Sequence, residues 1–132
     1  MKHHKQRELE RQMSALCVEL DHHLEDMFGE RYPLHPNRLP RGKASSVFYD
    51  GLFSTGTKFT LGYGSEAGRG YLVDVVISTL AKVAASDRDE IEQEAVRFIE
   101  EALPRYFPNR KLRVVKDGNV YKIVGDFSLG LL

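Results

Sequence analysis

Two segments of the sequence combine basic side chains with tyrosine, a mixture suited to binding anions. Residues 31–43 carry four Lys or Arg and no acid, and residues 105–116 carry five and no acid. Arginine offers paired hydrogen bonds to phosphate, and a tyrosine ring offers a face on which a base can stack. The candidate anion- or nucleic-acid-binding residues are therefore Arg31, Tyr32, Arg38, Arg41, Lys43, Arg105, Tyr106, Arg110, Lys111 and Arg113.

A structural role also explains these two segments. Each follows an acidic stretch, because residues 13–30 and residues 44–104 each sum to a net charge of −5. Cations near the C-terminal ends of helices interact favourably with the helix dipole and with acids of neighbouring helices. Exposed ion pairs of this kind contribute only ~0–1 kcal/mol each, so this alternative predicts no binding chemistry.

The glycine-rich stretch at residues 62–70 could also contact a ligand. Its first six residues fit the G-x-G-x-x-A pattern of dinucleotide-binding loops, but that pattern works only where a helix follows. A β-branched run follows here, so the sequence predicts a hairpin turn. A functional turn would bind an anion through Arg69 and its backbone amides, or form a small enzyme site beside Arg69, Asp74 and Glu66.

No set of side chains forms a recognisable catalytic or metal site. Glu19 and His22 have the spacing of one di-iron ligand pair, but such a site needs a second pair, and the second predicted helix has no histidine. Cys17 has apolar and acidic neighbours, which predicts a buried thiol rather than a reactive one. We therefore predict no catalytic residue, no metal and no cofactor.

The elements that must position these residues follow from the hydrophobic periodicity. Apolar residues recur every three or four positions from Leu9 to Met27, which predicts an amphipathic helix over residues 4–30. Prolines and glycines then interrupt residues 31–56, where only residues 47–49 indicate a short strand.

Alternating apolar and polar residues predict two β-hairpins. The first covers residues 57–80 around the glycine-rich turn, and the second covers residues 111–128 around an Asp-Gly turn. The helical spacing between them predicts a helix over residues 86–107. Ser86 or Asp87 would cap its start, with an acid three residues later, and Pro104 and Pro108 would end it.

This order predicts an α+β fold of helix–β-hairpin–helix–β-hairpin (αββαββ) form, with an antiparallel sheet and both helices on one face. The other face would expose Lys58, Thr60, Asp74, Ser78, Arg113 and Lys122. Pro-Asn-Arg follows each helix, at residues 36–38 and 108–110, which favours an internal αββ duplication. Chance is the alternative, because helix ends commonly collect these residue types.

The amino-acid composition limits which classes of function are possible. The 132 residues, 42% of them hydrophobic, suit one domain, which we place at residues 1–132. Nineteen basic residues balance nineteen acids, which excludes a uniformly basic nucleic-acid binder. One cysteine indicates a reducing, cytoplasmic setting. No apolar run approaches the ~20 residues of a membrane span, so we expect no membrane partner.

These observations favour a non-catalytic binding or adaptor protein that acts through protein–protein contacts or self-association. A homodimer would form through the helix at residues 4–30 or through the apolar tail at residues 129–132. The first alternative is nucleic-acid or phosphate binding through segments 31–43 and 105–116. The second is a small enzyme with its site at residues 62–70.

Overall fold

The computed structural model describes residues 4–44, 50–65 and 67–127. The elements follow the order α-β-β-α-β-β, so the predicted αββαββ order is confirmed. Their bounds are α1 (His4–Phe28), β1 (Phe53–Thr60), β2 (Gly70–Ile77), α2 (Ala85–Tyr106), β3 (Leu112–Asp117) and β4 (Val120–Gly125). No helix in the described ranges is both long enough and apolar enough to cross a bilayer.

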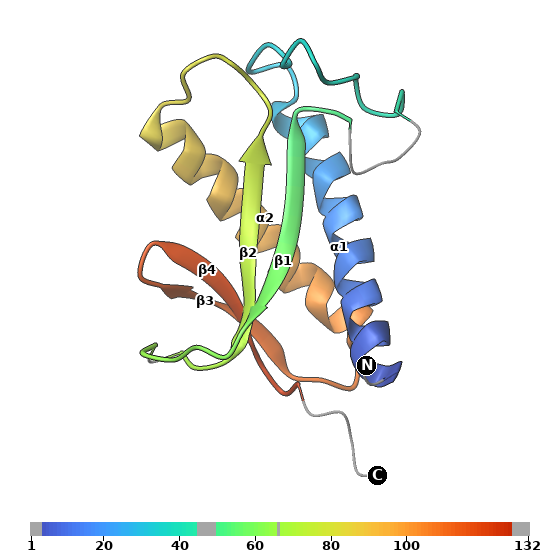
Figure 1. Ribbon diagram of the computed structural model, residues 1–132, viewed down its shortest axis with the longest axis vertical. Helices are drawn as coiled ribbons and strands as arrows, with labels where there is room; N and C mark the ends of the chain where they lie inside the picture. The colour runs from blue at the N-terminus through green and yellow to red at the C-terminus, as the bar shows by residue number, and fades with distance from the viewer. Residues whose placement is uncertain (1–3, 45–49, 66, 128–132) are drawn as a thin grey trace.

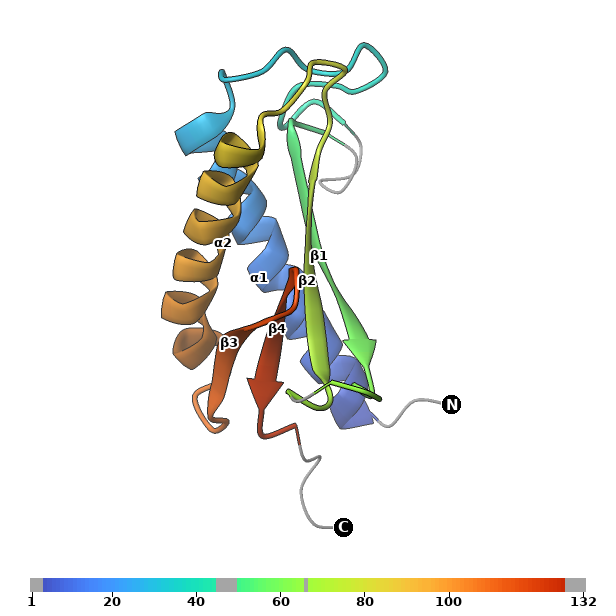
Figure 2. The same ribbon diagram turned by 90° about the vertical axis from the view of Figure 1, so that its left-hand side faces the viewer.

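The strands of the described residues form one antiparallel sheet in the order β1-β2-β4-β3. β1 and β2 pair along their whole length, from Phe53↔Ile77 to Thr60↔Gly70. β2 and β4 join the two hairpins, but they pair over only three residues on each strand. Both helices lie on the same face of the sheet (Figure 2), which confirms the predicted α+β arrangement.

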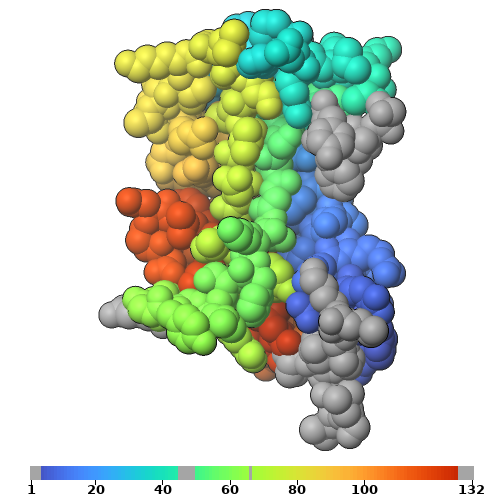
Figure 3. Space-filling view, viewed as in Figure 1, coloured from blue at the N-terminus to red at the C-terminus, as the bar shows by residue number. Residues whose placement is uncertain are grey.

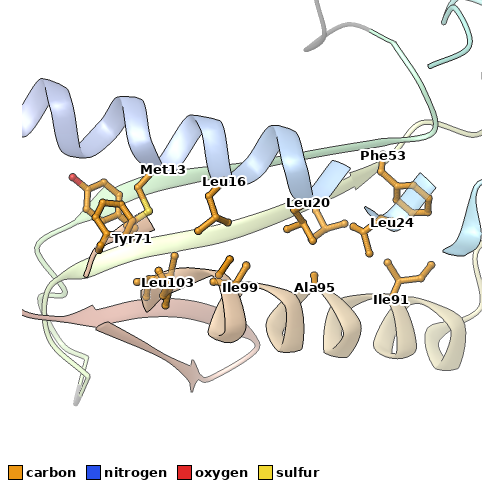
Figure 4. Packing of buried hydrophobic residues seen from close by; sticks show 14 of the residues in the cluster. Met13, Leu16, Leu20, Leu24, Phe53, Tyr71, Ile91, Ala95, Ile99 and Leu103 are labelled. Atoms are coloured by element: carbon orange, nitrogen blue, oxygen red, sulfur yellow. The ribbon is translucent and has the colours of Figure 1, made fainter. Parts of the chain in front are cut away.

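The hydrophobic core lies between the two helices and the covered face of the sheet. Leu16 and Leu20 of α1 point toward Ala95 and Ile99 of α2 (Figure 4), and each is at most 1% exposed. The apolar stripe of α1 is therefore buried inside the molecule. A homodimer through this helix would have to use its polar side.

The start of α2 differs from the prediction. The helix begins at Ala85, and its N-cap residue Ala84 makes no side-chain hydrogen bond. Asp87 instead accepts a hydrogen bond from the Tyr32 hydroxyl at 2.5 Å, so a tertiary contact replaces the predicted capping box. Pro104 lies inside the last turn, where its missing N–H costs one bond to the Glu100 carbonyl without ending the helix.

The first hairpin also has different bounds. β1 begins four residues before the predicted residue 57, because Phe53 is fully buried and the Thr55 N–H donates to Asp21 of α1 at 2.7 Å. β2 ends at Ile77 rather than residue 80. The short strand predicted at residues 47–49 lies outside the described residues.

The prediction that Lys122 is exposed on the uncovered face of the sheet is wrong. Lys122 does lie on that face, but it is only 1% exposed because residues 61–65 and 67–69 of the β1–β2 loop fold over it. Figure 3 shows this loop (green) standing out from the sheet. The β1–β2 loop therefore covers part of the face of the sheet that the helices leave open.

The topology matches what an internal duplication would produce. Exchanging β1 with β3 and β2 with β4 leaves the sheet order unchanged, and Tyr71 and Tyr121 then correspond near the centre. The connections differ in length, because residues 29–52 join α1 to β1 whereas residues 107–111 join α2 to β3. The duplication itself stays a prediction.

Candidate functional site

The two basic segments lie at opposite ends of the molecule. Residues 31–43 follow the end of α1 at the top of Figure 1, and residues 105–116 start in the last turn of α2, which ends toward the bottom. They are separated because the two helices run in opposite directions. The segments therefore do not flank one common ligand.

Arg38 and Arg41 of the first segment fasten the long loop to β1. The Arg41 guanidinium donates to Asp50 Oδ1 at 2.9 Å, to Glu25 Oε1 at 3.1 Å and to the Phe53 carbonyl at 2.6 Å. Asp50 is only 1% exposed, so Arg41 neutralises a buried charge. Arg38 donates to the Asp50 and Gly51 carbonyls and to a serine hydroxyl. Both guanidinium groups are therefore engaged in hydrogen bonds within the protein.

Two buried titratable groups of α1 lie beside this cluster. Burial raises the pKa of the Asp21 carboxyl to about 6, although hydrogen bonds from Thr55 act in the opposite direction. Burial also raises the pKa of the Cys17 thiol to about 11. A thiol in this state is a poor nucleophile, so Cys17 has a structural role.

The other tyrosines and arginines of the predicted set join the two helices. Arg31 donates to Glu90 at 2.8 Å, beside the Tyr32–Asp87 contact. At the other end, Arg105 donates to Glu19 at 3.1 Å. The Tyr106 hydroxyl also hydrogen-bonds to Glu19, and these two donors hold the pKa of that carboxyl below its usual range.

The remaining candidates are more exposed. Arg110 donates to the Asp126 carbonyl at 3.2 Å, whereas Lys43, Arg69, Lys111 and Arg113 are exposed. Lys43 lies in the first segment and Lys111 in the second, so the four residues do not share one end of the molecule. Their role in anion binding stays a prediction.

The glycine-rich loop encloses a buried cation. Lys122 Nζ lies 2.8 Å from the Gly68 carbonyl, 2.8 Å from Asp117 Oδ2 and 3.2 Å from Ser65 Oγ. Ser65 Oγ in turn donates to Asp117 Oδ2 at 2.5 Å. All three ammonium protons thus have an acceptor within reach.

These contacts hold the loop against the sheet. A hollow of about 510 Å³ adjoins the loop, lined by Gly64, Ser65, Ala67 and residues of β3 and β4. Arg69 and Asp74, predicted to line an enzyme site here, are not part of it, and Glu66 lies outside the described residues.

Histidines and acids do not converge on a metal site within the part of the chain that the structure describes. His23 Nε2 lies 2.6 Å from Glu94 Oε2, and its ring stacks on Phe98 with centroids 4.8 Å apart. Arg97 is the main cause that lowers the pKa of Glu94 to about 2, with His23 adding to it. This cluster joins α1 to α2.

The remaining candidate site is the edge of β2 beside α2, where β2 has no neighbouring strand. We call this site the β2 notch. It consists of residues 74–77 of β2, the neighbouring side chains of α2 and the β3–β4 turn. β4 pairs with β2 only up to Val73. Above that point Arg88 of α2 donates to the Val75 carbonyl at 3.3 Å, which shows that the backbone of Val75 faces away from β1. Figure 2 looks onto this edge, and no ribbon crosses it above β4.

The β2 notch contains a cavity of about 100 Å³ with a mixed lining. Apolar side chains come from both walls, and Asp74 and Glu92 add negative charge. The lining residues are Val73, Asp74, Val75, Glu92, Ala95, Val96, Asn119, Val120 and Tyr121. Sequence reasoning missed this site because it depends on where β4 diverges from β2, which no local pattern encodes.

Comparison with known proteins places the chain in a family. A family model described as "Uncharacterised protein" matches residues 4–125. The chain belongs to this family. It is 46% identical over 120 residues to an "Uncharacterized protein" of Borreliella burgdorferi, an alignment that covers 91% of this chain and 94% of that relative. No solved structure matches.

Proposed function

We propose that the protein is a binding module that takes up an extended segment of a partner protein as an added strand at the β2 notch. The unpaired edge of β2 carries this proposal. β1 pairs with all eight residues of β2, whereas β4 pairs with three. In strand addition, main-chain hydrogen bonds supply affinity and alternating side-chain pockets supply specificity.

The backbone of the β2 notch offers groups that an added strand needs. Val75 and Ile77 turn their N–H and C=O groups toward the notch, because alternate residues of an antiparallel strand face opposite neighbours. Among the described residues, neither N–H group has a hydrogen-bond acceptor, whereas the Ile77 carbonyl accepts from the Thr79 N–H at 3.0 Å. Arg88, whose side chain is 43% exposed, bonds the Val75 carbonyl and pairs with Glu92, so an added strand would have to displace it from that carbonyl.

The side chains of the notch favour a partner that alternates apolar and basic residues. Inward-pointing residues of an added strand would meet Val75 and Ala95 of the cavity wall. Outward-pointing residues would lie beside the exposed carboxylate of Asp74 and near Glu92. Lysine or arginine at these positions would gain from the opposite charge.

The other clusters of polar side chains also support a binding role over a chemical one. Arg41 neutralises Asp50, and Lys122 neutralises Asp117. Charged groups already committed to such pairs are not available to transfer protons or bind phosphate without breaking internal contacts.

Solution NMR with a defined peptide tests the proposal. We expect the capped peptide acetyl-Val-Lys-Val-Lys-Val-amide to shift the amide signals of Val75 and Ile77 and to slow their hydrogen exchange. The same peptide with N-methylated backbone should not bind, because it cannot complete the ladder. A peptide with glutamate in place of lysine should bind more weakly, because it meets Asp74.

Two results would contradict the proposal. Equal binding of the N-methylated peptide would show that no strand is added. Shifts confined to other parts of the molecule would place the contact elsewhere. The variant Val75→Pro removes the N–H group that faces the notch and should therefore lose peptide binding. Thr57→Pro, on the far edge of the hairpin, is the matched control and should keep it.

A further inference from the structure

The hollow of about 510 Å³ beside the β1–β2 loop, which we call the loop hollow, has walls from both hairpins. One wall is the loop itself, at Gly64, Ser65 and Ala67, and the other includes Arg113 and Val115 of β3. Figure 3 shows the loop (green) next to the turn of the second hairpin (red). The loop hollow therefore lies between two segments that are far apart in the sequence.

Two arginines lie close together at the loop hollow. Val114 packs against the hydrophobic core, so its neighbour Arg113 points to the open face of the sheet, where it is exposed. Arg69 is also exposed and directly precedes Gly70, the first residue of β2. At this level β2, β4 and β3 are adjacent, so the start of β2 lies two strand intervals, ~10 Å, from Arg113. The fold thus joins two arginines that the sequence analysis assigned to separate candidate sites.

The charge around the loop hollow is positive. Asp117 lines it, but Lys122 Nζ lies 2.8 Å from Asp117 Oδ2 and offsets that charge. Residues 51–73 contain two Lys or Arg and one acid, Glu66, which lies outside the described residues. Residues 106–116 contain four Lys or Arg and no acid. An anionic ligand would therefore be attracted to this place, although the whole chain is neutral.

Tyr63 supplies an exposed aromatic ring next to the loop hollow. It directly precedes Gly64 of the hollow wall, and it is 90% exposed. Such exposure leaves the faces of the ring accessible to a planar ligand. An added Cβ at Gly64 would have no atom within 4 Å, so a ligand has room to approach the loop backbone there.

We infer that the loop hollow binds single-stranded nucleic acid, with phosphate groups at Arg69 and Arg113 and a base stacked on Tyr63. Arginine gives paired hydrogen bonds to phosphate, and an aromatic ring can stack on any unpaired base. A duplex keeps its bases stacked inside and offers none to Tyr63. An acidic peptide such as polyglutamate would meet the arginines but would leave Tyr63 without a partner.

This site is separate from the β2 notch. The notch cavity is lined by Glu92, Ala95 and Val96 of α2, so it lies on the helix side of the sheet, whereas the loop hollow lies on the open side. Neither Tyr63 nor Arg113 lines the notch. Peptide binding at the notch should therefore survive changes to these two residues, and failure of one proposal leaves the other standing.

Fluorescence anisotropy with labelled oligouridine and oligodeoxythymidine tests the inference, at a length of about eight nucleotides, which is within the usual site size of single-strand-binding domains. We expect binding that weakens as salt is added, because phosphate contacts release counterions. Binding of either strand supports the inference, and the tighter of the two identifies the preferred sugar.

Variants of Tyr63 test the stacking contact. Tyr63→Ala should weaken binding roughly tenfold, whereas Tyr63→Phe should keep it, because phenylalanine also stacks on a base. Tyr63→Ala should leave the salt dependence unchanged, because it removes no charge. The side chain is 90% exposed, so both variants should fold, which circular dichroism checks.

A variant of Arg113 tests the phosphate contact. Arg113→Gln should lower the slope of log K against log salt by about 0.7, the value for one phosphate contact on a single strand. Lys43→Gln is the matched control, because Lys43 is an exposed cation of the first basic segment, at the opposite end of the molecule. It should leave both the affinity and the slope unchanged.

Four outcomes would overturn the inference. The first is that neither strand binds at low salt. The second is that Tyr63→Ala binds as tightly as the parent protein. The third is an equal loss in Arg113→Gln and Lys43→Gln, which would show attraction that is not localised. The fourth is displacement of the labelled strand by polyglutamate or a DNA duplex as readily as by an unlabelled single strand.

Discussion

Lys122 Nζ lies 2.8 Å from the Gly68 carbonyl oxygen, which ties the centre of the sheet to the loop that covers it. The same ammonium lies 2.8 Å from Asp117 at the second hairpin turn. One buried cation thus joins the two hairpins at the place where β2 and β4 share only a short ladder. This contact compensates for the few backbone bonds between the two halves.

Replacing Lys122 with methionine should therefore cost about 2–4 kcal/mol of unfolding free energy. The methionine fills similar space, but the Gly68 carbonyl and Asp117 lose their donor. Amide exchange in residues 61–69 should also accelerate. Urea unfolding measures the first effect and hydrogen–deuterium exchange the second. Lys58→Met, on the same face but exposed, should change stability by under ~0.5 kcal/mol, and an equal loss in both variants would contradict the argument.

Replacing Arg41 with methionine should destabilise the fold by roughly 3 kcal/mol, because it leaves Asp50 buried without its counter-charge. Thermal unfolding checks this, with Lys43→Met as the control in the same segment. The result bears on the anion-binding hypothesis as well. Loss of binding in an Arg41 variant would report unfolding, so exposed Arg69, Lys111 and Arg113 are the better positions for that test.

The stability of the protein should fall as the pH rises through the titration of Asp21. Its pKa is raised from 3.8 to about 6 by burial, with Thr55, Arg41 and His22 opposing the shift. The folded state therefore favours the protonated form. The contribution of this carboxyl to the free energy of unfolding is fully present below about pH 4 and is lost as the pH rises through about 6.

Asp21→Asn should remove this dependence, because an amide keeps an oxygen for the Thr55 N–H and never ionises. We expect it to raise stability at pH 7.5 by about 1–3 kcal/mol and to change little at pH 4. Urea midpoints at the two pH values measure the difference. Asp26→Asn, exposed on the same helix, is the control. A variant less stable than the parent at pH 7.5 would show that the charge itself is needed.

The sequence predicted the elements and the layers because they follow from local periodicity. The apolar spacing of α1 and the alternation in β2 each identify a buried face, and burying both faces leaves few arrangements. The boundaries were less accurate where tertiary contacts decide them. Asp87 accepts a hydrogen bond from Tyr32 instead of capping its own helix, and the Thr55 N–H donates to Asp21 of α1.

The predicted sites were harder to place because residue type does not reveal the partner. Arg38 and Lys43 belong to the same basic segment, yet one bonds carbonyl oxygens inside the loop and the other is exposed. Lys122 follows the alternation of an outward strand position, and only the return of the loop over it makes it buried. Such differences depend on contacts between distant parts of the chain.

Two glycines of the first hairpin give a last prediction, with opposite signs. An added Cβ at Gly70 would overlap the Ile123 carbonyl oxygen and lie 3.0 Å from Lys122 Cγ, whereas one at Gly56 meets nothing within 4 Å. Gly70→Ala should force β2 from β4 and cost about 2 kcal/mol or more. Gly56→Ala should add roughly 0.5–1 kcal/mol, because alanine restricts the unfolded chain. Urea unfolding of the two variants measures both, and a loss at Gly56 equal to that at Gly70 would show that strand glycines matter here for flexibility rather than for close approach.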